Sequence, residues 1–180
     1  FYNYEYAFYD SHLVSEFEKF KSHYIRFSTK PFDFLNIQAG LGTGNEIAYR
    51  EEIPKLGDRF SFNTSIEVTL NNNLRIKPSV NFSKLKKLDS QEYFFDGYIA
   101  RFDIRYQFTN SLNLRVISEY NEFSDQIFVQ TLISWRPNSD TIFYLGGNQN
   151  YIDEFVDYNS PNYRVNKSQL FLKFQYLIKS

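Results

Sequence analysis

Polar and apolar residues alternate along most of the chain, in segments of about ten to fourteen residues. The clearest segment runs from Leu74 to Ser83. Every second residue in it is apolar, with Pro78 among them, and the residues between are Arg, Lys, Ser or Asn. Successive side chains of an extended strand point to opposite faces, so the pattern predicts a strand with one apolar and one polar face.

The same alternation predicts further strands near residues 35–42, 59–70, 100–108, 112–121, 127–135, 143–147 and 170–178, with weaker ones over 1–9 and about 20–29. No segment has a convincing helical period. Asn71, Asn72 and Asn73 predict a tight turn between two strands, because Asn tolerates positive φ.

The expected connections alternate in length. Short ones lie near 30–33, 71–73, 109–111 and 137–140, and longer ones near 10–18, 43–58, 84–94 and 150–167, with 122–126 as a brief exception. If consecutive strands are antiparallel neighbours, the short turns fall at one end of the sheet and the long loops at the other. This sorting is typical of transmembrane barrels. We therefore predict an all-β, antiparallel up-and-down transmembrane β-barrel over residues 1–180, or the C-terminal part of a larger one.

Aromatic residues gather near both ends of the predicted apolar face. Those near the short turns are Tyr106, Phe108, Trp135, Phe143 and Tyr176, and those near the long loops are Phe60, Phe62, Phe82, Tyr98 and Tyr120. Rings at two levels are what two membrane interfaces select. These ten residues are the predicted membrane-interface aromatics.

The opposite face carries charges of both signs: Glu67, Arg75, Lys77, Arg101, Asp103, Arg105, Arg115 and Glu119. A Lys or Arg facing lipid at mid-membrane costs roughly 2–4 kcal/mol, so we expect these residues to line the lumen. They have two interpretations, a selective lining for anionic solutes or internal ion pairs that fill a narrow barrel. If ten strands close into a barrel by themselves, the lumen is narrow and internal ion pairs are favoured. If the chain is part of a wider barrel, a pore is favoured.

Composition narrows the chemistry. The chain has no Cys, no Met and two His, its net charge is −1, and aromatic residues make up 20% of it. Disulfides, thiolate zinc sites and thiol nucleophiles are excluded, and the interspersed charges form no footprint for nucleic acid. No window is apolar enough for a membrane-spanning helix. We expect a non-enzymatic protein without a cofactor or metal.

Three weaker patterns have simpler interpretations. Residues 40–44, Gly-Leu-Gly-Thr-Gly, lack the Lys-Ser/Thr of a phosphate-binding loop and no helical pattern follows them. Ser22 and His23 are adjacent in a strand and so point to opposite faces, which separates a nucleophile from its base. His12 lies in a predicted loop, from which it could approach Asp10. No set of acid, base and nucleophile is visible around either histidine, so we interpret both as ordinary polar residues at the long-loop end.

Acidic residues in the predicted loops and turns also suggest calcium, namely Glu46, Glu51, Glu52, Asp140, Asp153, Glu154 and Asp157, but their spacing lacks the regular ligand pattern. We interpret them as solvated acidic loops.

The second half of the chain resembles a known family. The resemblance rests on Gly97–Tyr151 and the ending F-L-K-F-Q-Y-L-I-K-S, and its motifs are R-x-x-x-R-Y-Q-F from Arg101, L-x-L-R with a following E-Y-N, W-R-P-N from Trp135 and T-x-F-Y-L-G from Thr141. The region is similar to the C-terminal β-barrel of an uncharacterised family of Gram-negative outer-membrane proteins. That family carries an N-terminal domain similar to carbohydrate-binding module family 9.

The resemblance implies an outer-membrane location with a periplasmic C-terminus, and lipids and lipopolysaccharide as partners, together with other outer-membrane or periplasmic proteins. We expect a role in transport, surface binding or envelope assembly, with glycan handling implied only through the family's N-terminal module. That module is absent here, the chain starts at Phe1, and it ends Ile178-Lys179-Ser180 rather than on an aromatic residue. We therefore expect a fragment of a longer protein. The alternatives are an outer-membrane hydrolase with a loop-borne site and a soluble ligand-binding β-barrel.

Overall fold

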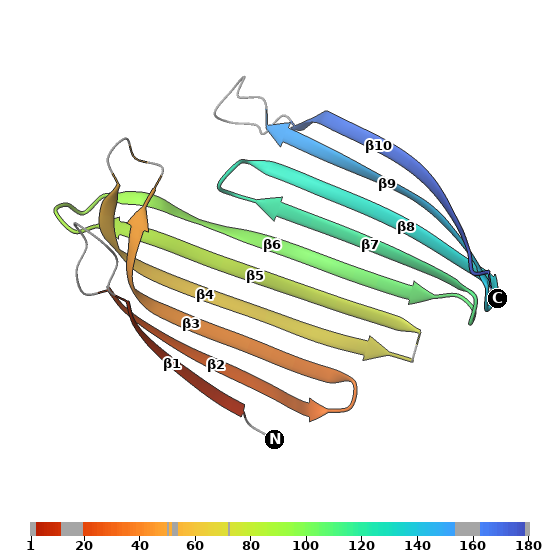
Figure 1. The fold of residues 1–180 in the computed structure, drawn as a ribbon, viewed down its shortest axis with the longest axis horizontal. Helices are drawn as coiled ribbons and strands as arrows, with labels where there is room; N and C mark the ends of the chain where they lie inside the picture. The colour runs from red at the N-terminus through yellow and green to blue at the C-terminus, as the bar shows by residue number, and fades with distance from the viewer. Residues whose placement is uncertain are drawn as a thin grey trace. The chain divides into compact units, whose positions relative to one another are not determined.

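The computed structural model describes residues 3–11, 20–49, 51, 54–71, 73–153 and 163–178, with side chains from residue 21 onward. Strands account for nearly all of them (Figure 1). The strands are β1 (Asn3–Ser11), β2 (Phe20–Phe32), β3 (Leu35–Ala48), β4 (Lys55–Leu70), β5 (Leu74–Lys87), β6 (Tyr93–Gln107), β7 (Leu112–Asn121), β8 (Gln126–Asn138), β9 (Thr141–Asp153) and β10 (Tyr163–Tyr176).

All ten strands belong to one sheet, and their order in the sheet is their order in the sequence. Each strand pairs with its sequence neighbours in an antiparallel up-and-down meander (Figure 1). The predicted fold class is confirmed to this level. The predicted closed barrel is not formed, because within the described residues β1 pairs with β2, β10 pairs with β9, and the linear order leaves both as edges. No helix in the described part of the chain is long and apolar enough to cross a membrane.

The predicted sorting of the connections is confirmed. Residues 33–34, 71–73, 108–111 and 139–140 make the connections at one end of the strands, and residues 12–19, 49–54, 88–92, 122–125 and 154–162 connect them at the other. Asn71 has a φ of 51° in the connection between β4 and β5, as the Asn run predicted. We call the two ends of the strands the short-turn end and the long-loop end.

Several strands are longer than predicted, and most of the extra residues of β3, β5 and β9 lie at the long-loop end. β3 continues to Ala48, β5 continues to Lys87, and β9 reaches Asp153. Apolar alternation fades in these extensions, so the period-two signal stops before the strand does. Backbone pairing needs no apolar side chain, which is why a polar segment can prolong a strand whose neighbour is also extended.

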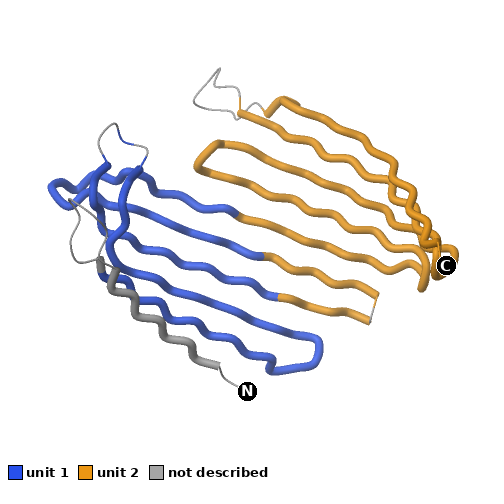
Figure 2. The backbone as a smooth tube through the Cα atoms, viewed as in Figure 1, with its two compact units in different colours: residues 1–66, 79–99 blue, residues 67–78, 100–180 orange. Residues whose placement is uncertain are grey.

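The chain divides into two compact units, residues 1–66 with 79–99 and residues 67–78 with 100–180 (Figure 2). The division passes through β4, β5 and β6, so each of these strands contributes residues to both units. The charged residues predicted to line a lumen all belong to the second unit.

Few described apolar residues are fully buried. In the first unit Leu85 of β5 has no exposed surface, and an added Cβ on Gly57 would lie 3.0 Å from its Cδ1. In the second unit Ile117 of β7 is 3% exposed. By the strand alternation both side chains lie on the polar face, beside Lys and Arg residues rather than among the Leu and Phe side chains of the other face.

Gly57 should be intolerant of any side chain. A Cβ there would stand 2.6 Å from the Lys86 carbonyl oxygen, a backbone atom that moves only with its strand. We expect Gly57→Ala to lower the free energy of unfolding by about 1–3 kcal/mol through overpacking. The matched control is Gly147→Ala, whose nearest contact would be 3.2 Å. Urea unfolding followed by circular dichroism measures both, and equal effects would contradict the packing described here.

Candidate functional site

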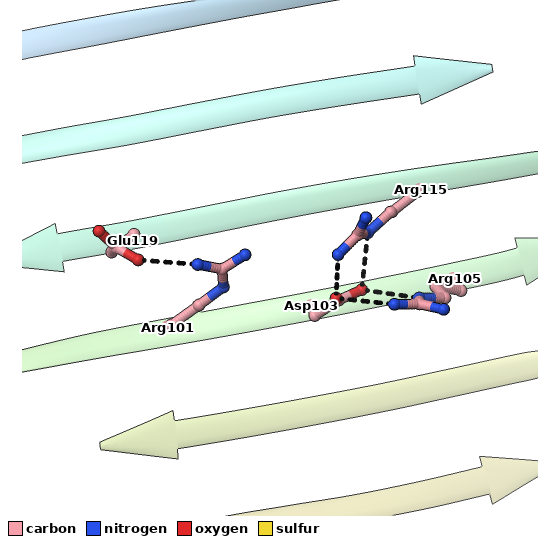
Figure 3. A network of polar contacts seen from close by, with 5 residues as sticks. All are labelled: Arg101, Asp103, Arg105, Arg115 and Glu119. Carbon is pink, nitrogen blue, oxygen red and sulfur yellow. Dashed lines mark hydrogen bonds and ion pairs between the residues drawn. The ribbon is translucent and has the colours of Figure 1, made fainter. Parts of the chain in front are cut away.

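The polar face of β6 and β7 carries a network of ion pairs between neighbouring strands (Figure 3). Arg101 Nη1 donates to Glu119 Oε2 at 3.1 Å. A charge-assisted bond between adjacent strands fixes two long side chains across the sheet instead of along it. The sequence placed both residues on one face, and the structure brings them together.

Asp103 is the centre of the network, because two arginines donate to the same carboxylate. Arg115 donates from Nη2 to Oδ2 at 2.8 Å and from Nε to Oδ1 at 3.4 Å. Arg105, on the same strand, donates from Nε to Oδ1 at 3.2 Å and from Nη2 to Oδ2 at 3.3 Å (Figure 3). Only 14% of the Asp103 side chain is exposed, so this carboxylate is compensated where water reaches it poorly.

The remaining predicted lining residues lie on β4 and β5. Arg75 Nε is 3.6 Å from Glu67 Oε1, a longer contact than those of Asp103. Lys77 forms no ion pair with any residue that the structure describes. Two of the five cations therefore share one carboxylate and a third has no carboxylate partner in the described chain, so positive charge is in excess on this face.

The polar face is also where apolar side chains are most enclosed. Ile117 lies between Arg115 and Glu119 in the sequence, with the same alternation, and only 3% of it is exposed. Long arginine side chains bury their stems while keeping their charged ends wet, so they can cover a smaller apolar residue. Alternation alone places Ile117 on this face.

The apolar face has no cover in the described chain, because every described element belongs to the sheet itself. Its large side chains are correspondingly exposed: Phe102 is 51% exposed and Leu172 is 75% exposed. Other exposed residues at alternating positions of these strands are Leu41, Phe62, Ile66, Leu70, Ile104, Tyr106, Ile133, Trp135, Leu145, Leu170, Phe174 and Tyr176. An uncovered apolar surface of this extent marks a surface that contacts something other than water.

Aromatic rings form a row across three strands at the short-turn end. Trp135 of β8 pairs in register with Phe143 of β9, and Phe143 pairs with Phe174 of β10. The ring centroids are 5.3 Å and 5.0 Å apart. Tyr106 and Phe108 contact each other edge to face at 4.7 Å. The structure thus brings Trp135 and Phe143, and Tyr106 and Phe108, together and adds Phe174, which is not among the predicted membrane-interface aromatics.

The aromatics predicted near the long loops are less uniform. Phe60 and Phe82 contact each other at 6.1 Å, and Phe62 is exposed. Tyr98 and Tyr120 are partly buried, and the Tyr120 hydroxyl lies 3.5 Å from Asp125 Oδ1 in the β7–β8 connection.

The glycine-rich residues 40–44 lie inside β3, where Gly40 and Gly42 are buried. Asn63 Nδ2 donates to the Tyr24 hydroxyl at 3.1 Å, and a Cβ on Gly40 would lie 2.8 Å from the Asn63 amide. The glycines therefore make room for polar side chains from β2 and β4. A strand filled in this way offers no loop that could wrap a phosphate, in agreement with the interpretation as small residues.

The other sequence candidates are not gathered into a site. Ser22 and His23 occupy consecutive positions of β2, paired with Gly44 and Thr43. Glu46 forms an ion pair with Arg59 at 3.2 Å. In the ranges that the structure describes, no three His, Asp or Glu residues are placed to hold a metal ion. Four of the candidate residues from the sequence lie outside the ranges that the structure describes, namely His12, Glu52, Glu154 and Asp157.

Comparisons with protein-family models, with curated proteins and with solved structures found no match to this chain.

The Asp103 network should contribute more to stability than the Arg75–Glu67 pair. The Asp103–Arg115 contact is bidentate and its carboxylate is sheltered from water, whereas Arg75 and Glu67 make a single 3.6 Å contact between more exposed groups. The coupling free energy of such an exposed pair is about 0.2–1 kcal/mol, and that of the Asp103 pair should be larger. Double-mutant cycles with Asp103→Asn and Arg115→Gln, and with Glu67→Gln and Arg75→Gln, measure both couplings. We expect the first to be at least twice the second. Equal couplings would show that Asp103 gains nothing from its two donors.

Proposed function

We propose that this chain is a non-enzymatic outer-membrane β-barrel protein whose apolar face contacts lipid and whose polar face meets water and solutes. The uncovered apolar face carries the proposal. A sheet in water must bury its apolar face against a second layer, and the described chain supplies none. Hydrocarbon lipid chains can cover such a face without any further protein element.

Three further features support this proposal. The strands of 13 to 16 residues in β2 to β6 exceed the roughly 9–11 residues that cross a bilayer, and the connections sort by length between the two ends. The row of Trp135, Phe143 and Phe174 lies at one level of the apolar face, as expected for an interface. Short turns on the periplasmic side would place the C-terminus there.

The proposal also requires that the sheet be closed in the membrane. Open strand edges are not tolerated in hydrocarbon, since each unpaired N–H and C=O would lack a partner. The edges of β1 and β10 must therefore pair in the membrane, with each other in a ten-stranded barrel or with additional strands in a larger one. We propose lipids and lipopolysaccharide as contacts of the apolar face and transport, surface binding or envelope assembly as the role. Glycan handling follows from the family resemblance alone.

Trp135 offers a direct test, because it is the chain's single tryptophan and it lies in the aromatic row of the apolar face. The full chain would be reconstituted in vesicles whose phospholipids carry bromine at defined depths. We expect strong quenching of Trp135 fluorescence, greatest for bromine near the headgroups. A soluble ligand-binding barrel would instead enclose the ring and fold without lipid, so lipid-free folding with no quenching would refute the proposal.

Charge placed on the two faces of β9 should have opposite consequences. Leu145 is exposed on the apolar face, and Asn148 lies on the polar one. We expect Leu145→Arg to lower the unfolding free energy in lipid by about 2–4 kcal/mol, as for arginine facing mid-membrane. Asn148→Arg, the matched control, should change it by less than about 1 kcal/mol. If Leu145→Arg is harmless and improves solubility without lipid, the apolar face does not meet a membrane.

A further inference from the structure

Three arginines stand side by side across β5, β6 and β7 on the polar face. The backbone N–H of Gln107 donates to the Asn73 carbonyl at 2.8 Å, and that of Phe108 donates to the Leu112 carbonyl at 3.0 Å. Counting along antiparallel strands from these bonds puts Arg75 opposite Arg105 and Arg105 opposite Arg115. Like charges directly opposite one another destabilise a sheet, so this row carries a cost.

The same three arginines line one hollow of about 410 Å³. No carboxylate is among its lining residues, and the other polar side chains there include Asn73, Gln107 and Asn113. Asp103 and Glu67 contact the arginines from outside this lining. The hollow therefore presents three fixed positive charges and several neutral hydrogen-bonding groups, with the neutralising carboxylates set to one side.

The arginines also keep donors directed away from Asp103. That carboxylate engages Nε and Nη2 of both Arg105 and Arg115, which leaves each Nη1 outside the pair. A guanidinium has five N–H donors, and its fork matches the oxygens of a carboxylate or phosphate. About half of the Arg75 and Arg105 side chains is exposed, so a solute can reach them.

We infer that this hollow, the arginine hollow, binds the anionic group of a small water-soluble carboxylate or phosphate compound. The bound anion would bridge Arg75 to the Arg105–Arg115 pair and relieve the repulsion along the row. Asp103 competes with it, since it holds two of the three guanidinium groups, and so sets the affinity at a level that permits release. This inference deepens the proposed function, because it rests on the polar face being the water-filled side.

The test is calorimetric titration of the full chain, folded in an uncharged detergent and a zwitterionic buffer, with citrate and with inorganic phosphate as probes. We expect saturable binding that weakens as NaCl is added, because screening shortens the reach of the arginine charges. Arg75→Gln should raise Kd about ten-fold, the loss of one charge-assisted contact. Arg75 makes only a 3.6 Å contact in the described chain, so this change spares the Asp103 network.

Two further variants separate a binding site from a structural network. Asp103→Asn removes the competing carboxylate and should lower Kd about five-fold, by the magnitude of one unit charge near the surface. Arg101→Gln is the matched control for Arg75→Gln: it also removes one positive charge from the polar face, but Arg101 lies on β6, pairs with Glu119 and does not line the hollow. Kd should stay within about two-fold of the parent value in that variant.

Several outcomes would overturn the inference. The first is that folded protein shows no saturable binding of citrate or phosphate. The second is that Asp103→Asn weakens binding in protein whose circular dichroism is unchanged. The third is that Arg101→Gln and Arg75→Gln lower the affinity equally. Binding of phosphatidylglycerol micelles without binding of either soluble probe would also overturn it. If Trp135 is quenched by brominated lipid while no anion binds, the membrane proposal stands and only the arginine hollow is refuted.

Discussion

Successive side chains of an extended strand point to opposite faces of a sheet, and in this chain the two faces carry opposite chemistry. Each strand must satisfy two environments at once. In β6, Phe102 and Ile104 belong to the uncovered apolar face. Arg101, Asp103 and Arg105, which alternate with them, belong to the ion-pair network of the polar face. A one-residue slip in pairing would exchange the two sets, so the register of the meander is tied to this contrast.

The polar face is organised by cross-strand charge pairing and by small residues. Asp103 collects two arginines, Glu119 holds a third, and Ile117 lies enclosed beside them. In the first unit, buried glycines of β3 make room for Tyr24 and Asn63 in place of charges. The polar side chains therefore differ between the units: those of the first are mainly amides and hydroxyls, and those of the second carry a positive excess that the arginine row concentrates.

Strand existence, pairing order and the sorting of connections could be predicted from sequence because each leaves a local mark. Alternation marks the strand, and Asn71 marks a turn through its positive φ. The strand extensions could not, since residues such as those at 43–48 pair through their backbones and carry no apolar period. Alternation could not predict the open edges at β1 and β10 either. It tells which face each side chain is on, and it says nothing about whether the first and last strands pair.

For the charged residues, the sequence predicts which face of the sheet each one lies on, but not which residue it pairs with. Alternation put Asp103, Arg105 and Arg115 on one face, and Arg105 is two residues from Asp103 on the same strand. The contact of Arg115 with the same carboxylate depends on its reach to a diagonal position of the neighbouring strand, which period two does not encode. Alternation also placed Phe174 and Ile117 on their faces, but only the structure shows that Phe174 contacts Phe143 and that Ile117 is buried.

The most direct test of the account is spin-label accessibility along β6, which is clean because the chain has no native cysteine. Single cysteines at residues 101 to 106 of the full chain in lipid would carry the label. Collisions with oxygen, which is concentrated in lipid, should peak at 102, 104 and 106, and collisions with a water-soluble nickel complex should peak at 101, 103 and 105. Nickel accessibility that is equal at all six positions, or oxygen maxima on the arginine side, would contradict it.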